Sequence, residues 1–364
     1  MAESRENLCR AWLSCAESLT WKARERVFAA FPDAGAAFEG FSDDFLALVG
    51  EKAYRELSAL RQKGLDKLAL ALTRADVRLC GRGDGDFPEL LTSIPDPPDL
   101  LFYKGLMRRE EPRAIAVVGS RRETRYGREQ AFGIARDLAR AGVTVVSGLA
   151  RGIDTAAHRG ALEGHGRTVA VLGSGIKNVY PEENRPLAEQ IIREGGALVS
   201  EFHPTAEPLA FRFPFRNRLV SGLCQGVLLI EAREKSGTLI TVGHALAQGR
   251  EVFALPGQVD APCSAAPHRL LREGARLVTS AADVLEDMGW GTQEAPRPPA
   301  TEPADLTLEQ RRLYDALCDE PKSLDLLMEE LGMSAARASV LVTQMELMGC
   351  VEALPGRMVR RAAQ

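Results

Sequence analysis

The sequence predicts an α/β fold whose core is a doubly wound, mostly parallel sheet. Three short apolar runs, rich in β-branched residues, begin at Ile115, Val143 and Thr168, and each ends in a turn of glycine and serine. Continuous apolar runs are typical of parallel strands that are buried on both faces. Strand-like and helix-like segments alternate as far as about Val284, which indicates right-handed crossovers. The carboxyl ends of such strands meet at one edge of the sheet, where doubly wound proteins bind nucleotides or phosphate chains, so we expect function there.

The composition is that of an ordinary globular protein. The chain has 364 residues, of which 45% are hydrophobic and 26% charged, and this length suggests two or three domains. The net charge of −4 does not by itself indicate a nucleic-acid partner. However, residues 105–287 contain 24 basic and 21 acidic residues, whereas the remainder contains 22 and 29. A modest positive field is therefore expected on the middle of the chain.

The cysteine pattern and the hydropathy indicate the cellular compartment in which we expect the protein. The seven cysteines are scattered, with no CxxC pair and no histidine pair beside them, which favours reduced thiols over disulfides or a zinc site. The first residues have no apolar signal segment, and no stretch reaches about eighteen apolar residues. We therefore expect a cytoplasmic protein without a membrane partner, a metal or a cofactor.

The elements follow in order along the chain. Residues 1–75 show helical periodicity broken by turns and predict a helical domain. Residues 76–287 form the sheet domain, which begins with an extended entry segment whose GRGDGD motif (residues 81–86) is expected to be a turn, because it does not lead from a strand into a helix. The proline-rich residues 288–305 predict a stiff linker. Further strands are expected at residues 197–200, 226–230 and 251–255, and helices at 128–141, 154–163, 186–194 and 239–248.

Residues 306–364 predict a small winged-helix domain. Short helices surround Gly332-Met-Ser334, and a hairpin-like segment follows at residues 354–357. The domain has 7 basic and 9 acidic residues, and the expected recognition helix, residues 335–348, has Arg337 as its one cation. A reader of duplex DNA needs a basic face, so this composition favours contacts with protein over binding in a DNA groove.

The first two strand-end turns provide candidate phosphate cradles. Gly119 and Ser120 offer backbone N–H groups beyond a strand, and the Arg121 guanidinium can pair with a phosphate through two hydrogen bonds. Ser147 and Gly148 end the next strand in the same way.

Three further segments add candidate DNA-binding residues. The loop after the third strand carries Lys177, suited to a second phosphate, together with Tyr180 and Asn184. The FRFPFRNR stretch interleaves rings with cations, as suits a single strand, and we expect its phenylalanines to be mostly packed and its arginines to face the site. A Ser-Gly-Thr sequence at a predicted helix start is an anion site by its geometry. The candidates from the last two segments are Arg216, Asn217, Arg218, Lys235, Ser236, Gly237 and Thr238.

Catalytic motifs are absent from the sequence. It has no GxSxG elbow, no HExxH, no P-loop and no GxGxxG after a strand. Asp154 and His158 lie four residues apart on one predicted helix, where a local ion pair is favoured over an acid–base pair. The residues therefore predict a binding protein and not an enzyme.

The middle block carries a specific set of motifs. They read VVGSRRETRYG, VVSGLARGIDTAAHRGAL, AVLGSGIKNVYPEEN, ALVSEF, FPFRNRLVSGL, IEAREKSGTLITVGHAL and GREVFALPG. Together they closely resemble the DNA-processing protein A (DprA/Smf) family of bacteria. The terminal domains match this family in outline, as a sterile-alpha-motif-like or helix-hairpin-helix-like module and a winged helix.

The resemblance implies an extended Rossmann-like sheet that binds single-stranded DNA without sequence preference and has no turnover chemistry. It also implies that the protein loads RecA recombinase onto single strands during natural transformation and displaces or bypasses single-strand-binding protein. A homodimer is implied near the end of the middle domain, with His268, Leu271 and Leu277 in the interface. The preceding loop, residues 258–268, departs from the family pattern.

The sequence leaves two alternative functions open. The same sheet resembles LOG-type nucleotide phosphoribohydrolases, although Thr241 stands where their glutamate should be, and threonine cannot act as a general acid or base at neutral pH. A winged-helix regulator with a nucleotide-sensing Rossmann domain is the second alternative, and the acidic balance of residues 306–364 opposes it.

Overall fold

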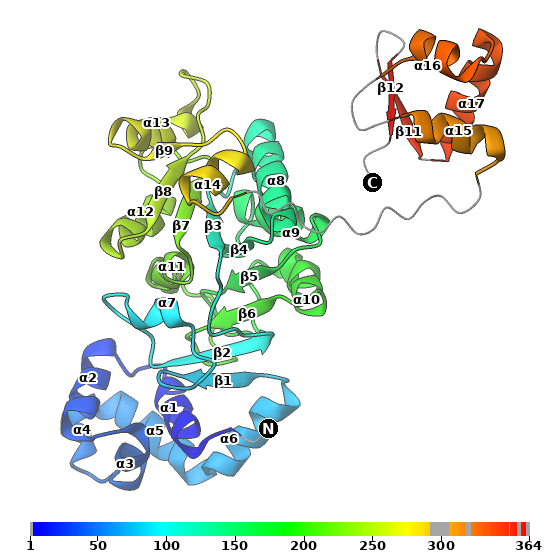
Figure 1. Cartoon of the computed structure of the whole chain (residues 1–364). Helices are drawn as coiled ribbons and strands as arrows, with labels where there is room; N and C mark the ends of the chain where they lie inside the picture. The colour runs from blue at the N-terminus through cyan, green and yellow to red at the C-terminus, as the bar shows by residue number, and fades with distance from the viewer. Residues whose placement is uncertain (1–2, 292–305, 318–321, 349, 355–357, 362–364) are drawn as a thin grey trace. The chain divides into compact units, whose positions relative to one another are not determined.

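The computed structural model of the chain describes residues 3–291, 306–317, 322–348, 350–354 and 358–361 (Figure 1). The chain divides into two compact units, Met1–Ala295 and Pro296–Gln364, and each has its own hydrophobic core.

A nine-stranded sheet forms the centre of the larger unit. Its strands are β1 (Arg78–Gly81), β2 (Leu100–Gly105), β3 (Ala114–Val118), β4 (Thr144–Ser147), β5 (Thr168–Val171), β6 (Ala197–Ser200), β7 (Gly226–Leu229), β8 (Glu251–Ala254) and β9 (Arg276–Leu277). Their order in the sheet is β1-β2-β6-β5-β4-β3-β7-β8-β9. All the pairings from β6 to β9 in this order are parallel, which confirms the predicted sheet.

The entry segment is more than an extended connector. It supplies β1 and β2, which pair with each other and with β6 in antiparallel register. The first four residues of β2 are buried, and Phe102 lies opposite both Leu79 and Ser200. The partner strand β6 comes much later in the chain, so no local pattern could specify this pairing.

Helices cover both faces of the sheet, as the alternation of strand residues requires. Ala116 and Val118 face one core, which contains residues of α7, α11, α12 and α13, while Ile115 and Val117 face the other core, with residues of α8, α9 and α14. The helices are α7 (Glu89–Thr92), α8 (Arg125–Arg140), α9 (Ile153–Glu163), α10 (Arg185–Arg193), α11 (Arg212–Gly222), α12 (Thr238–Ala247), α13 (Ala265–Arg272) and α14 (Ala281–Asp287), with short 3-10 turns η1 (Glu182–Asn184) and η2 (Pro262–Ser264).

Helix α11 occupies much of the cationic stretch to which the sequence analysis assigned no element. Pro214 lies in its first turn, where a missing backbone N–H costs nothing because no intrahelical acceptor is available there. Arg212 and Arg216, one turn apart, are both buried. The helix therefore directs part of the cationic stretch inward.

The N-terminal residues are helical, as predicted. Their core surrounds Trp12, whose indole N–H donates to the Leu57 carbonyl at 2.9 Å, and whose ring lies 5.0 Å from that of Phe38. This layer packs against β1, so it belongs to the same unit as the sheet (Figure 1). The helices are α1 (Arg5–Ser14), α2 (Trp21–Ala30), α3 (Ala34–Glu39), α4 (Phe45–Val49), α5 (Glu51–Lys63) and α6 (Leu65–Arg74).

The smaller unit is a winged helix, as predicted. Its elements are α15 (Leu308–Ala316), β10 (Lys322–Ser323), α16 (Leu324–Leu331), α17 (Ala335–Leu347), β11 (Val351–Leu354) and β12 (Met358–Arg361). Its three strands are arranged in the order β10-β12-β11. The expected tip of the hairpin, residues 355–357, and linker residues 292–305 lie outside the described residues. Within the part of the chain that the structure describes, no helix is long and apolar enough to cross a membrane.

The predicted ion pair between Asp154 and His158 is wrong. His158 is completely buried, and its Nδ1 lies 2.7 Å from the Thr168 hydroxyl. That hydroxyl donates its single proton to the Val145 carbonyl, so Nδ1 carries the ring proton and donates to Thr168. Burial, with a smaller effect of Arg216, lowers the pKa of His158 to about 3. A neutral imidazole thus joins α9 to the sheet.

This burial predicts a loss of stability on acidification. The pKa in the folded state lies below the ordinary value of 6.5, so the unfolded chain takes up the proton first and stability falls as the pH drops from 6.5 toward 3. In His158→Gln this contribution disappears, and we expect the melting temperature to fall less between about pH 7 and pH 5 than in the unmodified chain. Calorimetry measures this slope. His165→Gln, a change at an exposed histidine, is the control that keeps the original slope, and an equally steep slope in His158→Gln would contradict the assignment.

Candidate functional site

A large cleft lies where the strand order of the sheet reverses. The chain runs outward from β3 through β4 and β5 to β6, then returns to place β7 on the other side of β3. In open α/β sheets, ligands bind at such a switch point, beyond the carboxyl ends of the strands. A cavity of about 710 Å³ occupies this position, and residues 119–122 after β3 and Arg233 and residues 235–238 after β7 line it.

The turn after β3 retains free backbone donors. The Ser120 carbonyl accepts from Ile153 N–H, and its hydroxyl bonds to the backbone of Arg122, which fixes the turn. The N–H groups of Ser120 and Arg121 have no partner among the described residues. Gly119 is required for the close approach of α9, because a Cβ there would lie 2.6 Å from Ile153 Cγ1. This turn is an open cradle.

The loop after β7 forms the second open wall. It leads into α12, and Thr238 N–H bonds to the Ser236 hydroxyl at 3.2 Å. The backbone N–H groups of Lys235, Ser236 and Gly237 have no partner among the residues that the structure describes. Free N–H groups and the positive end of the helix dipole both favour an anion at such a helix start.

Two contacts hold these loops together. The Thr238 hydroxyl donates to the Gly119 carbonyl at 3.0 Å. The buried Glu231 carboxylate accepts from both the backbone N–H and the hydroxyl of Thr124. Gly127 leaves room for this carboxylate, since a Cβ there would lie 2.2 Å from its carbon. The two loops therefore form one site although they are far apart in sequence.

Four exposed cations face this cavity. They are Arg121, Arg122, Arg233 and Lys235, and none forms an ion pair with any described residue. The Arg121 guanidinium lies 5.3 Å from the centre of the Phe213 ring, and Tyr180 is 5.7 Å from Phe213 on the cavity wall. The site thus combines unpaired positive charge with accessible aromatic surface.

The predicted site residues omit three of these wall residues, Arg122, Arg233 and Phe213. Arg233 stands two residues before Lys235 in the same loop, and this spacing was a usable signal. Phe213 was expected to be mostly packed, but it is half-buried and lines the cavity. Its position depends on where α11 begins, and the sequence did not show that helix.

The turn after β4 is not an open cradle, contrary to the prediction. Ser147 is completely buried and donates to the Val117 carbonyl at 2.7 Å. The N–H groups of Gly148 and Ala150 donate to one carboxylate oxygen of Asp154, at 3.1 and 3.3 Å. An internal carboxylate therefore occupies the position that a phosphate was expected to take.

Arg216 balances that carboxylate from beneath the cavity. Its Nη1 donates to the Gly148 carbonyl at 2.8 Å and also to the Val171 carbonyl. Burial lowers the pKa of Arg216 to about 10, against the opposing effect of Asp154, so the guanidinium stays protonated at neutral pH. Burial also raises the pKa of Asp154, and Arg216 opposes this rise. Arg216 lines the cavity and is 3% exposed, so it supports the site instead of projecting from it.

Of the two residues after Arg216, one lines the cavity and the other does not. Asn217 lines the cavity and is half-buried. Arg218 does not line it, since its guanidinium forms ion pairs with Asp96 at 2.9 Å and Glu201 at 2.8 Å. The expectation that all three residues face the site is therefore wrong for Arg218, because a helix places adjacent residues on different faces.

The turn after β5 is also closed. Its N–H groups at Gly175 and Lys177 donate to the carbonyls of Ala206 and Pro204, at 2.9 and 2.8 Å. The Lys177 side chain is exposed but does not line the cavity. Asn184 is buried, and its amide donates to the Leu149 carbonyl at 2.9 Å.

The three residues expected at a dimer interface lie near the β9 edge of the sheet. His268 Nε2 lies 3.0 Å from the Gly257 carbonyl, and Leu271 is half-buried against the core. Leu277, on β9 itself, is 55% exposed.

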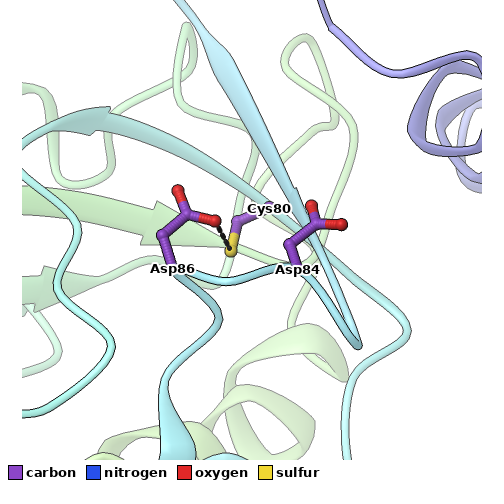
Figure 2. Close-up of side chains that lie close together, drawn as sticks. All are labelled: Cys80, Asp84 and Asp86. Carbon is purple, nitrogen blue, oxygen red and sulfur yellow. Dashed lines mark hydrogen bonds between the residues drawn. The ribbon is translucent and has the colours of Figure 1, made fainter.

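A cluster of Cys80, Asp84 and Asp86 brings three potential metal ligands together (Figure 2). Hydrogen bonds within the protein already engage all three. The Cys80 thiol donates to Asp86 Oδ1 at 3.4 Å, and Asp84 Oδ2 accepts the Gly81 N–H at 2.7 Å. Burial raises the pKa of Cys80, so the thiol keeps its proton. The cluster is best explained as the turn that the GRGDGD motif predicts.

The comparisons with known proteins agree with this architecture. The family model described as DNA recombination-mediator protein A matches residues 78–289. The chain belongs to this family. The model described as the DprA winged helix domain matches residues 296–357. The resemblance inferred from the sequence motifs is therefore confirmed.

Individual relatives support the same assignment. Protein Smf of Escherichia coli K12 is 40% identical over 279 residues, which cover 75% of each protein. The structure of DNA processing protein A from Streptococcus pneumoniae aligns with a TM-score of 0.65 at 34% identity, over 79% of this chain and 99% of that one. DNA processing protein A from Helicobacter pylori, which binds single-stranded DNA, aligns with a TM-score of 0.52 at 26% identity, over 59% and 96%.

Because Arg216 packs against Gly148, we expect that one methyl group added at residue 148 lowers the stability of the fold. In Gly148→Ala the new Cβ would lie 2.5 Å from Arg216 Nη2, and the buried guanidinium has little room to move. We expect a destabilisation of about 1–3 kcal/mol, seen as a lower melting temperature. Gly133→Ala in α8 is the matched control, because its Cβ meets nothing within 4 Å and alanine favours a helix by up to about 1 kcal/mol. Equal melting temperatures for the two variants would refute the role of Gly148.

Proposed function

We propose that this protein binds single-stranded DNA without sequence preference and loads RecA recombinase onto it during natural transformation and recombination. The observation that carries the proposal is the pair of open loops after β3 and β7. Between them they present unpartnered backbone N–H groups and four exposed cations without ion pairs among the described residues. Such groups bind the phosphates of any sequence.

The two aromatic rings that line the cavity, those of Tyr180 and Phe213, favour a single strand over a duplex. Tyr180 and Phe213 offer ring faces beside the phosphate-binding loops, and a base can stack on them once it is free of its partner. Bases within a duplex already stack on their neighbours and present only their edges. Stacking together with phosphate contacts is typical of proteins that bind single strands without reading sequence.

The proposed binding residues are those that the site brings together. Arg121, Lys235 and the backbone of the two open loops contact phosphates, while Asp154 and Arg216 position the floor. We further propose that the protein acts in the cytoplasm as a homodimer through the β9 edge, near His268, Leu271 and Leu277, and displaces or bypasses single-strand-binding protein.

We propose no catalytic step. Thr241 lies on the cavity wall where the LOG-type hydrolases have a glutamate. Among the described residues that line the cavity, Asp154 is the one carboxylate, and its Oδ2 atom accepts two backbone N–H groups beside a buried arginine. A general acid or base must reach a substrate, and this carboxylate belongs to a residue that is 8% exposed and already accepts backbone N–H groups of the protein.

The cations predict a test by affinity and salt dependence. Arg121→Ala and Lys235→Ala should each weaken binding to oligothymidylate by about tenfold, and each should reduce the slope of log affinity against log salt by about 0.7. Arg193→Ala, an exposed charge at the end of α10, removes the same charge outside the cavity and should change neither quantity. Filter binding or fluorescence anisotropy over a range of salt concentrations measures both the affinity and the salt slope. Wild-type affinity in the double variant would contradict the site.

RecA loading is tested separately from binding. On single strands covered by single-strand-binding protein, the unmodified chain should shorten the lag of RecA filament formation, and Arg121→Ala should not. RecA-dependent ATP hydrolysis follows the filament. A chain that binds DNA but leaves the lag unchanged would contradict the loading step alone.

A further inference from the structure

A second cleft lies next to the cavity and has a different character. It has a volume of about 460 Å³ and lies between the end of α1, the start of α2, and the segment that joins β6 to α11. Four aromatic rings line it, those of Trp21, Phe202, Phe211 and Phe215. All of these residues belong to the larger unit.

Two of the rings are far more exposed than large apolar side chains usually are. Phe211 is 69% exposed and Trp21 is 51% exposed. They come from separate elements that line the cleft, one from the residue before α11 and the other from the first residue of α2. Exposed apolar surface that is gathered in a concave site, unlike scattered exposed residues, marks a place where something binds.

Most of the charged groups that line the cleft are already paired. The exception is Arg24, which donates to the Ser14 hydroxyl at 3.2 Å and forms no ion pair among the described residues. Arg212 is 5% exposed, with its guanidinium 5.1 Å from the centre of the Phe202 ring, and it forms an ion pair with Glu17 at 3.7 Å. Glu201 forms an ion pair with Arg218. The cleft therefore offers ring and guanidinium faces and little free charge, which suits nucleobases better than phosphates.

The cleft and the cavity share one wall. Pro208, Ala210 and Phe213 line the cavity, while Phe211 and Arg212, in the same stretch of chain, line the cleft. A strand that passes over this stretch would leave the phosphate-binding loops and reach the exposed ring of Phe211 next.

We propose that this aromatic cleft is a base-stacking subsite for the segment of single-stranded DNA that continues from the cavity. The proposal rests on the proposed function, which it extends from phosphate contacts to a second group of nucleotides. The N-terminal helices contribute to DNA binding through Trp21, and the cleft adds affinity that depends on bases and on strand length.

The two subsites respond differently to salt and to strand length. Loss of a stacking ring removes no phosphate contact, so Phe211→Ala and Trp21→Ala should weaken binding of a long oligothymidylate by about tenfold and leave the salt slope unchanged. Binding of an oligomer just long enough to fill the cavity should be unaffected. Replacing the bases beyond the cavity with abasic sites should weaken the unmodified chain equally and make it insensitive to Phe211→Ala.

The experiment is anisotropy with oligothymidylates of increasing length, with and without abasic sites, on the full-length chain. Leu246→Ala, at an apolar side chain on α12 that is 61% exposed outside the cleft, is the matched control and should bind at all lengths like the unmodified chain. If Phe211→Ala and Trp21→Ala bind the long oligomer normally while Arg121→Ala does not, the cleft inference fails and the proposed function stands. If Arg121→Ala also binds normally, the proposed function fails.

Tryptophan fluorescence gives a second readout that needs no disruption of the cleft. The sequence has three tryptophans, and Trp12 is 1% exposed. In a Trp290→Phe chain the exposed Trp21 should be quenched by the long oligothymidylate and not by the short one. Salt-sensitive binding of the long oligomer without quenching would overturn the proposal, and it would direct attention to a protein partner for the cleft.

Discussion

The buried contact of Asp154 and Arg216 with the ends of β4 and β5 is the constraint on which the site depends. A charge that leaves water is stabilised by hydrogen bonds and by an opposite charge nearby. Asp154 takes its hydrogen bonds from the N–H groups of Gly148 and Ala150, and Arg216 gives its own to the carbonyls of Gly148 and Val171. The contact therefore fixes the floor of the cavity and closes one of its turns to outside anions.

The unpartnered backbone N–H groups that suit an anion belong to the two loops beside the switch point. The loops after β3 and β7 come together because the sheet reverses its strand order between them, and the Glu231–Thr124 and Thr238–Gly119 contacts keep them together. A chain with a net charge of −4 can thus present a positive site, since the unpaired cations gather at one edge while most acidic groups lie elsewhere.

The sequence predicted what local patterns determine. The apolar runs of β3, β4 and β5, the open turn at Gly119 and the unpartnered N–H groups before α12 follow from residues that are adjacent in the chain. The closed turns were not predicted, for two different reasons. Asp154 is close in sequence to Gly148 and Ala150, but the residue pattern does not show that its carboxylate turns back onto their N–H groups. The turn after β5 is closed by residues 204–206, which come much later in the chain. The antiparallel β2 and the inward direction of Arg218 also depend on distant partners.

Amide hydrogen exchange measured with and without oligothymidylate distinguishes the open turns from the closed ones, because it reports each turn separately. We expect new protection in peptides that cover residues 119–124 and 233–238, which contain the unpartnered N–H groups of Ser120, Arg121, Lys235, Ser236 and Gly237. We expect little change at residues 147–150, where the N–H groups of Gly148 and Ala150 already donate to Asp154. DNA-dependent protection confined to residues 147–150 or to the turn after β5, with the two open loops unchanged, would contradict the proposed DNA site.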